Sequence, residues 1–406
     1  MNNVKMDNIK HPAIVLGMSA NGLSVARALG EKNIKVIGVD HNPRMEGMFS
    51  RYLWKKYICP YPDSDEFIEF LYSLGHEHPE KCVVFPTADE YLLPLSEYRD
   101  DFHRHFIYLL PSKEIVSCFL DKEKTSKFAL KYGIPHPKTA VVSTADELDE
   151  AIDQVGLPCF FKPIISHITN KYITGKGFEA HTREQCFDFY KKVLEMSPRM
   201  LLQEVIPGGE GLVYEYMAYC DQQSTILADF TGRKVRQYPP KFGIGCLSES
   251  IRNQELATLG KKIIQETDYK GLVHFECKND PRTKKFIFLE TNLRTSYIGQ
   301  LSVASGINLP WIAYLNLVSG YLPQQPLSQV DGIKLLNIVL DLGHYVRARS
   351  QDDITLRQWL SAFNTLNIAH AYWRWNDPLP WVMVYSRLLS GASRKALSFF
   401  IRRPSA

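Results

Sequence analysis

The chain has 406 residues, 45% of them hydrophobic and 23% charged, and a formal net charge of +4 at pH 7. Its length predicts two or three domains, and its composition is typical of a soluble globular protein. So small a net charge gives no reason to expect a nucleic acid partner. The eight cysteines form no CxxC pair and lie mostly in apolar runs, so we expect free thiols and neither disulfides nor a zinc site.

The sequence predicts no export signal. The N-terminal stretch MNNVKMDNIKHP has no apolar segment of signal-peptide length, and no run of about 20 residues is both apolar and free of charge. Together with the free thiols, this predicts a cytoplasmic protein without a spanning helix.

The first predicted unit, residues 1–114, is a doubly wound α/β domain. A buried strand at 13–17, a helix at 23–29 and a second strand at 34–40 give it a β-α-β opening. Two further strands are expected, at 82–86 and 107–110.

This opening shares some features with dinucleotide-binding folds. Asp40 lies at the end of the second strand, where such folds place an acid for the ribose, and Gly17 and Gly22 lie in the first turn. The full G-x-G-x-x-G motif is absent. A nicotinamide- or flavin-dependent oxidoreductase is therefore an alternative to be tested and not the favoured interpretation.

A second unit is predicted over residues 115–330, where helices and strands are mixed. Helices are expected after Asp121, at 256–267 and at 306–319, and strands at 160–163, 200–206, 212–220 and 223–230. A polar loop is expected at 165–177, a basic loop at 231–241 and a glycine-rich loop at 242–247.

The stretch from Phe275 to Tyr297 carries the strongest chemical signal. Two apolar, strand-like runs flank the turn sequence Asn279-Asp280-Pro281-Arg282, which predicts a hairpin. The carboxylates Glu276 and Glu290 lie near the ends of the two runs, so we expect them on one face. The alternative is a polar hairpin face that is simply exposed to water.

Two residues that follow Glu290 extend this pattern. Alternation along a strand places Glu290, Asn292 and Arg294 on the same side. Carboxylate and amide oxygens are ligands that Mg²⁺ accepts, and a guanidinium stabilises phosphoryl charge. The stretch therefore predicts a magnesium–triphosphate site.

Read together, residues 115–320 resemble an ATP-grasp domain, and the N-terminal unit resembles the Rossmann-like domain that precedes it in that superfamily. The resemblance implies an α/β and α+β fold: a pre-ATP-grasp domain, a two-subdomain ATP-grasp domain and a C-terminal extension. It also implies an enzyme that activates a carboxylate with ATP as an acyl phosphate, which a nucleophile then attacks. ATP and Mg²⁺, with Mn²⁺ as a substitute, are the implied cofactors.

The resemblance assigns roles to residues that bind the nucleotide. Lys122 and Lys162 match the two nucleotide lysines, and Glu210 matches the acid that binds the ribose hydroxyls. The segment Gln203-Glu204-Val205-Ile206 matches the linker that hydrogen-bonds adenine. A lysine carried by a strand suits its role because it is a positioned point charge for phosphate oxygens. For the two lysines the alternative is an ordinary solvated side chain, and for Glu210 it is a charged turn residue.

The resemblance also assigns the metal ligands and the flap. Glu276, Glu290 and Asn292 match the family's metal ligands, and Arg294 matches the catalytic arginine that follows them, although Leu293 stands where proline is usual. The loop at 165–177 would be the flap over the phosphates. It departs from the family's glycine-rich form and has Lys176 as its phosphate candidate.

The basic run at 231–241 lies where the family places a cation that faces the triphosphate. Lys234, Arg236 and Lys241 are the candidates, and the sequence does not choose among them. The interpretation gives nucleotide binding to Lys234 and catalysis to Arg236 and Lys241. A basic loop that is only solvated is the alternative.

The last predicted unit, residues 331–406, is a C-terminal extension with an apolar strand at 333–340 and a short helix at 356–364. From 381 to 406 the chain mixes apolar residues with cations and has no acid. Either this tail is a helix docked on the core, or it contacts an anionic membrane surface from the cytoplasmic side. The segment Asp377-Pro378-Leu379-Pro380 is similar to that of bacterial carboxylate–amine ligases of the D-aspartate ligase type.

We therefore interpret the chain as an ATP-dependent ligase that joins a carboxylate to an amine and releases ADP and phosphate. The expected substrates are small molecules, such as an amino acid or an envelope precursor, and the expected state is a homodimer or a monomer. An ATP-dependent carboxylase and a nucleotide-binding regulatory protein with an inactive site are the alternatives.

Overall fold

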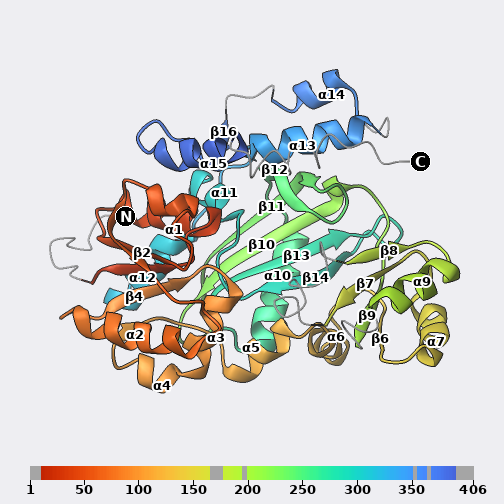
Figure 1. The fold of residues 1–406 in the computed structure, drawn as a ribbon, viewed down its shortest axis with the longest axis horizontal. Helices are drawn as coiled ribbons and strands as arrows, with labels where there is room; N and C mark the ends of the chain where they lie inside the picture. Colours follow the sequence, from red (N-terminus) through yellow and green to blue (C-terminus); the bar gives the residue numbers. More distant parts are fainter. Residues whose placement is uncertain (1–10, 165–176, 194–198, 351–353, 364–366, 390–406) are drawn as a thin grey trace.

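The computed structural model describes residues 11–164, 177–193, 199–350, 354–363 and 367–389, which form three sheets flanked by helices (Figure 1). None of the helices in these ranges is long and apolar enough to cross a membrane. The flap candidate Lys176 and the tail from residue 390 onward lie outside the described residues.

The N-terminal unit is a parallel sheet flanked by helices. Its elements are β1 (Ala13–Leu16), α1 (Ala20–Gly30), β2 (Val36–Asp40), η2 (Glu46–Phe49), β3 (Leu53–Ile58), α2 (Asp65–Glu77), β4 (Cys82–Pro86), α3 (Asp89–Glu97), α4 (Arg99–Phe102) and β5 (Phe106–Ile107). The strand order is β3-β2-β1-β4-β5. Strands β1, β2 and β4 are fully buried apolar runs, which is why the sequence reveals them. The edge strand β3 alternates between half-buried and exposed residues and was not predicted.

A small lobe follows, built on an antiparallel sheet of order β6-β9-β7-β8 and drawn at the right of Figure 1. This part contains α5 (Lys113–Leu120), α6 (Lys122–Lys131), β6 (Thr139–Val142), α7 (Asp146–Val155), β7 (Cys159–Pro163), β8 (Phe178–Ala180), α9 (Arg183–Val193) and β9 (Met200–Glu204). Helix α6 begins where the sequence predicts, because the Asp121 carboxylate accepts the backbone N–H groups of Glu123 and Lys124.

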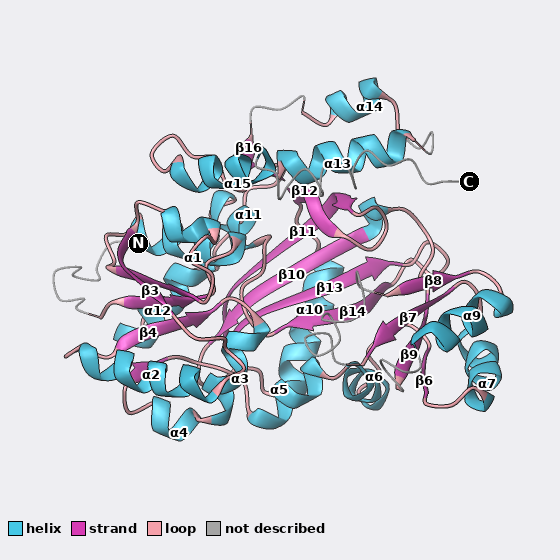
Figure 2. Ribbon diagram, viewed as in Figure 1, coloured by secondary structure: helices cyan, strands magenta, loops and turns pink. Residues whose placement is uncertain are grey.

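The largest sheet has the order β14-β13-β10-β11-β12-β15-β16 and crosses the centre of the molecule (Figure 2). Its region contains η3 (Glu210–Leu212), β10 (Val213–Cys220), β11 (Ile226–Tyr238), β12 (Ile244–Ser250), α10 (Gln254–Thr267), β13 (Gly271–Asn279), β14 (Phe286–Asn292), α11 (Gly299–Ala304), α12 (Leu309–Ser319), β15 (Lys334–Leu336), α13 (Ile338–Arg349), α14 (Leu356–Ser361), β16 (Ile368–His370) and α15 (Leu379–Leu389). On β10, Tyr216 joins the core cluster that includes α10, and Met217 joins the cluster that includes α12. The two helices therefore cover opposite faces of the sheet.

The structure corrects three local expectations. The basic run expected as a loop belongs to strand β11, which pairs with β10 on one side and β12 on the other. The glycine-rich run at 242–247 enters strand β12 at Ile244. The strand expected at 333–340 ends at Leu336, because the Asn337 side chain accepts the N–H of Leu340 and caps α13.

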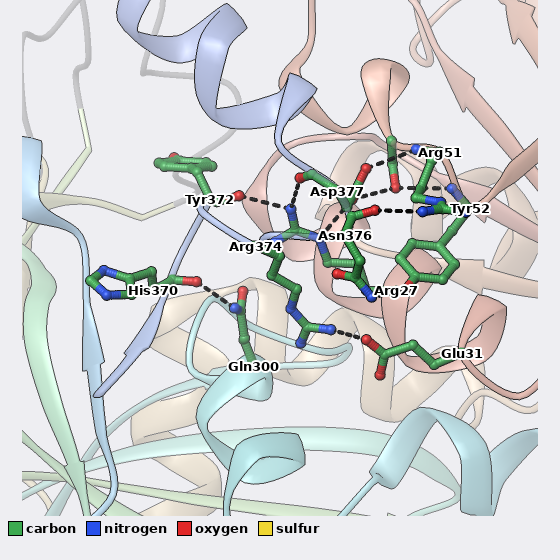
Figure 3. A network of polar contacts seen from close by, with 11 residues as sticks. Arg27, Glu31, Arg51, Tyr52, Gln300, His370, Tyr372, Arg374, Asn376 and Asp377 are labelled. Carbon is green, nitrogen blue, oxygen red and sulfur yellow. Dashed lines mark hydrogen bonds and ion pairs between the residues drawn. The ribbon is translucent and has the colours of Figure 1, made fainter. Parts of the chain in front are cut away.

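The C-terminal segment returns to the N-terminal domain through a buried polar network (Figure 3). The carboxylate of Asp377 accepts hydrogen bonds from Arg27 Nε (2.9 Å), Ser50 Oγ (2.8 Å) and the backbone N–H of Arg51 (2.8 Å). Arg27 also donates to the carbonyl of Tyr372 at 2.7 Å. Because β15 pairs with β12, the sheet continues across residue 330, the predicted boundary of the extension.

Candidate active site

Residues from all three sheet regions line one cavity of about 630 Å³. Most of the residues assigned from the sequence are among them: Lys122, Lys162, Gln203, Glu204, Val205, Ile206, Lys234, Lys241, Glu276, Glu290, Asn292 and Arg294. Residues far apart in the chain thus meet at one concave place, which is where ligand sites usually form.

The predicted hairpin forms the end of the cavity where the metal is expected. In the antiparallel pair β13–β14, Glu276 lies directly opposite Glu290, and His274 lies opposite Asn292. Opposed residues share a face of the sheet, so the two carboxylates and the amide point to the same side. Arg294 lies just beyond the end of β14 and still lines the cavity, where its Nε donates to Asp89 Oδ1 at 2.9 Å.

These residues fit a divalent cation. Lys234 forms an ion pair with Glu276, and the two side chains are only 4% and 11% exposed. A positive charge is needed there, because a buried carboxylate is costly without one. Within the described ranges no group of three or more His, Cys, Asp or Glu side chains is placed to hold a metal, so the ligand set of two carboxylates and the Asn292 amide stays a prediction.

The linker at 203–206 organises the end of the cavity where adenine is expected. Lys162 Nζ donates to Gln203 Oε1 at 2.8 Å, which fixes the ammonium in the cavity. Glu204 accepts the backbone N–H of Lys138 at 3.2 Å. Lys278, which the sequence reasoning missed, donates to the carbonyl of Ile206 at 2.8 Å, and burial lowers the pKa of its ammonium.

Glu210 lies beside this end but not in the main cavity. It lines an adjoining hollow of about 590 Å³ that shares Glu204, Lys241 and Lys278 with the cavity. Its two carboxylate oxygens accept the backbone N–H groups of Gln237 (2.8 Å) and Lys241 (2.7 Å). Glu210 therefore holds the turn after β11, and its role toward a ribose stays a prediction.

Arg236 lies outside the cavity, against helix α13. Its Nε and Nη2 donate to the two oxygens of Asp341 on α13, at 2.7 and 2.9 Å. The indole of Trp359 donates to the same carboxylate at 2.8 Å. Arg236 is not among the residues that line the cavity, so its predicted contact with phosphate has no support in the geometry.

The sequence reasoning also missed residues that complete the cavity. His274 and Glu215 line it, with His274 Nε2 3.4 Å from Glu215 Oε1. A signal for His274 was present, because it precedes Glu276 by two residues and alternation puts both on one face. No local signal existed for Asp89, which comes from the N-terminal domain and meets Arg294 only in the folded chain.

The comparisons with known proteins agree with the predicted resemblance to ATP-grasp proteins. No family model matches the chain. The D-aspartate ligase of Enterococcus faecium is 22% identical over 319 residues, which are 75% of this chain and 76% of the relative. The sequence-based resemblance and fold class are thereby confirmed.

Two solved structures match the fold over most of the chain. An N5-carboxyaminoimidazole ribonucleotide synthetase in complex with ADP has a TM-score of 0.65 at 15% identity and covers 85% of this chain and 86% of its own. The biotin carboxylase domain of the Hydrogenobacter thermophilus 2-oxoglutarate carboxylase, solved with MgADP, ADP and bicarbonate, has a TM-score of 0.61 at 13% identity. It covers 80% of this chain and 73% of its own. The expected class, an ATP-using ligase, agrees with all three proteins.

Proposed function

We propose that this protein is an ATP-dependent carboxylate–amine ligase that passes through an acyl phosphate and releases ADP and phosphate. The observation that carries the proposal is the facing pair Glu276 and Glu290 with Asn292 beside it, in the cavity that also takes in Lys162 and the linker. Phosphoryl transfer needs positioning and charge neutralisation more than a nucleophilic side chain, and this is what the cavity offers.

In this proposal the residues of the cavity have different roles. Glu276, Glu290 and Asn292 hold Mg²⁺, which neutralises phosphate charge when bound. Lys162, fixed by Gln203, presents its ammonium to phosphate oxygens, and Lys122 and Lys241 add charge from the cavity wall. Arg294 lines the same cavity with its Nε held by Asp89, which supports a role in binding the carboxylate that would be phosphorylated.

A carboxylase is the second candidate, because two structural matches act in carboxylation by their names and one was solved with bicarbonate. In that case bicarbonate takes the place of the acid. An ADP-release screen separates the two: amino acids, small peptides and envelope precursors are tested with bicarbonate removed and with bicarbonate added. ADP release that needs bicarbonate favours the carboxylase.

Glu290→Ala tests the site itself. We expect ADP release to fall on the order of 1,000-fold, because charge neutralisation at the phosphates is lost. Glu255→Ala, on the exposed first turn of α10, is the matched control and should keep wild-type turnover. Full turnover by Glu290→Ala would show that the assignment of this site is wrong, and absence of ADP release with every substrate mixture would favour the inactive regulatory protein.

A further proposal concerns where the protein acts in the cell. We propose contact of the C-terminal region with an anionic membrane surface, supported by an exposed apolar stripe on α13 formed by Ile338, Leu342 and Val346. Arg347 and Arg349 end the same helix.

Two variants test this contact. Because α15 packs on η2, the informative deletion removes only residues 390–406, and Leu342→Ser tests the apolar stripe on α13. We expect the wild-type protein to sediment with anionic vesicles and not with neutral ones, and the two variants to lose this sedimentation. Wild-type protein that stays in solution with both kinds of vesicle would contradict the proposal.

A further inference from the structure

A buried histidine contacts one of the three candidate metal ligands. His274 is 3% exposed, lines the cavity and lies opposite Asn292 in the β13–β14 pair. Its Nδ1 lies 2.9 Å from Asn292 Nδ2. An amide nitrogen can only donate a hydrogen bond, so Nδ1 of the imidazole is the acceptor and carries no proton.

This contact decides which way the Asn292 amide faces. The amide has a nitrogen on one side and an oxygen on the other, and only the oxygen can ligate a hard cation. With Nδ2 engaged by His274, Oδ1 is the amide atom available to a cation at Glu276 and Glu290. Without an acceptor at Nδ1, the amide is free to turn and present its N–H groups to the cation.

The other ring nitrogen fits the same arrangement. An imidazole with no proton on Nδ1 carries its proton on Nε2, which lies 3.4 Å from Oε1 of Glu215. Glu215 is 5% exposed and lies opposite Glu276 on the neighbouring strand β10. The two atoms form no hydrogen bond in the described structure, but the negative charge of the carboxylate attracts a proton on Nε2, which agrees with Nδ1 as the acceptor from Asn292.

We propose that His274 is a positioning residue, which holds the Asn292 amide with its oxygen toward the divalent cation. The inference rests on the proposed function only in that Glu276, Glu290 and Asn292 hold the metal. It predicts that metal affinity depends on an acceptor at the place of Nδ1, and not on a histidine as such. Partners of metal ligands commonly change affinity by about 10- to 100-fold when removed.

Two amide variants test whether metal affinity depends on an acceptor at the place of Nδ1 or on a histidine as such. In His274→Asn the side-chain amide can occupy the place of Nδ1, and in His274→Gln it reaches the place of Nε2. The measurement is the Kd of Mn²⁺ in the presence of ADP, followed by electron paramagnetic resonance of free Mn²⁺. We expect His274→Asn to stay close to the wild-type Kd and His274→Gln to raise it by about tenfold or more.

Kinetics give a second readout that a merely structural role would not move. With Mg²⁺ varied and ATP saturating, His274→Gln should raise the Mg²⁺ concentration needed for half-maximal ADP release, while His274→Asn should leave it unchanged. Equal Mn²⁺ affinity in all three proteins, or an equal loss in both variants, overturns the proposal. A wild-type protein that binds no Mn²⁺ instead overturns the metal site on which it rests.

Spectroscopy of the wild-type protein keeps the proposal testable even where the variants fail to fold. In protein labelled with ¹⁵N-histidine, the ring signals that Mn²⁺ broadens most strongly should show an unprotonated Nδ1 and a protonated Nε2. The opposite tautomer at this ring would mean that Nδ1 donates to the amide oxygen, and that outcome overturns the proposal.

Discussion

Two buried ion pairs lie two residues apart on strand β11, and they serve different parts of the molecule. Lys234 pairs with Glu276 inside the cavity, whereas Arg236 pairs with Asp341 against α13. Both pairs are almost fully buried, so burial of opposite charges does not by itself mark a functional site. The difference is that the first pair faces an open cavity lined by further ligands, and the second is closed by the indole of Trp359.

The cause of this difference is a break in the register between β11 and β12. Lys234 pairs with Ser248 and Arg236 pairs with Leu247, so Val235 of β11 is extra, and a second irregularity between Arg236 and Gln237 restores the register. A bulge of this kind shifts the alternation of side chains along the strand. Regular alternation would have placed Lys234 and Arg236 on one face, and the bulge instead turns Arg236 toward α13.

The largest effect is expected at the cavity pair. Lys234→Met removes a charge from the phosphate region and should lower kcat for ADP release on the order of 100- to 1,000-fold. Arg236→Met should keep kcat per folded molecule near the wild-type value. Equal loss of kcat in the two variants would break the distinction and return Arg236 to the catalytic role predicted from the sequence.

Thermal stability tests the structural role of the Arg236 pair. Arg236→Met leaves the Asp341 carboxylate buried without its cation, which costs about 3–5 kcal/mol in such pairs, so the Tm should fall markedly. Arg233→Met is the control on the same strand, because the Arg233–Glu249 pair is partly exposed and should contribute about 1 kcal/mol or less. A Tm loss no greater than that of Arg233→Met would contradict the structural role of Arg236.

Divalent cation should separate the two variants further. In Lys234→Met a bound Mg²⁺ can replace the missing positive charge beside Glu276, so MgADP should raise the Tm of this variant more than that of the wild type. Binding at 100 times Kd contributes about 2.7 kcal/mol. MgADP should raise the Tm of Arg236→Met only as much as that of the wild type, since the cation does not reach Asp341. Thermal scans with ADP alone and with MgADP measure this difference.

The smallest expected effect is a pH dependence near Asp341. Burial, with the nearby Asp341 charge as the second cause, raises the pKa of the Cys246 thiol above its ordinary value of 9.0. A raised pKa in the folded state stabilises the fold below pH 9.0 and loses that contribution as the pH rises above it. Between about pH 8 and pH 10, Cys246→Ala should therefore lose less Tm than the wild type. A steeper loss in the variant would contradict this sign.

Where local pattern decides structure, the sequence was sufficient. The hairpin over Phe275 to Tyr297 was predicted because two alternating runs flank a strong turn, and α10 because its apolar positions repeat with helical spacing. Strand β3 was missed because its half-buried positions include Lys55 and its exposed positions include Trp54 and Ile58, so the sequence LWKKYI shows no apolar–polar alternation. The end of β15 was missed because the Asn337 cap acts within a run that is otherwise apolar.

The sequence alone determined which chemical groups this protein has and the order in which they occur: two carboxylates and an amide on a hairpin, a lysine on a strand and a basic run between them. Tertiary structure decided which of these groups meet. The bulge at Val235 sends Lys234 and Arg236 to different partners, and the folded chain brings Asp89 to Arg294 across 205 positions. Local pattern fixes a residue's element, but the face it occupies and its distant neighbours depend on register and domain packing, which no short window of sequence contains.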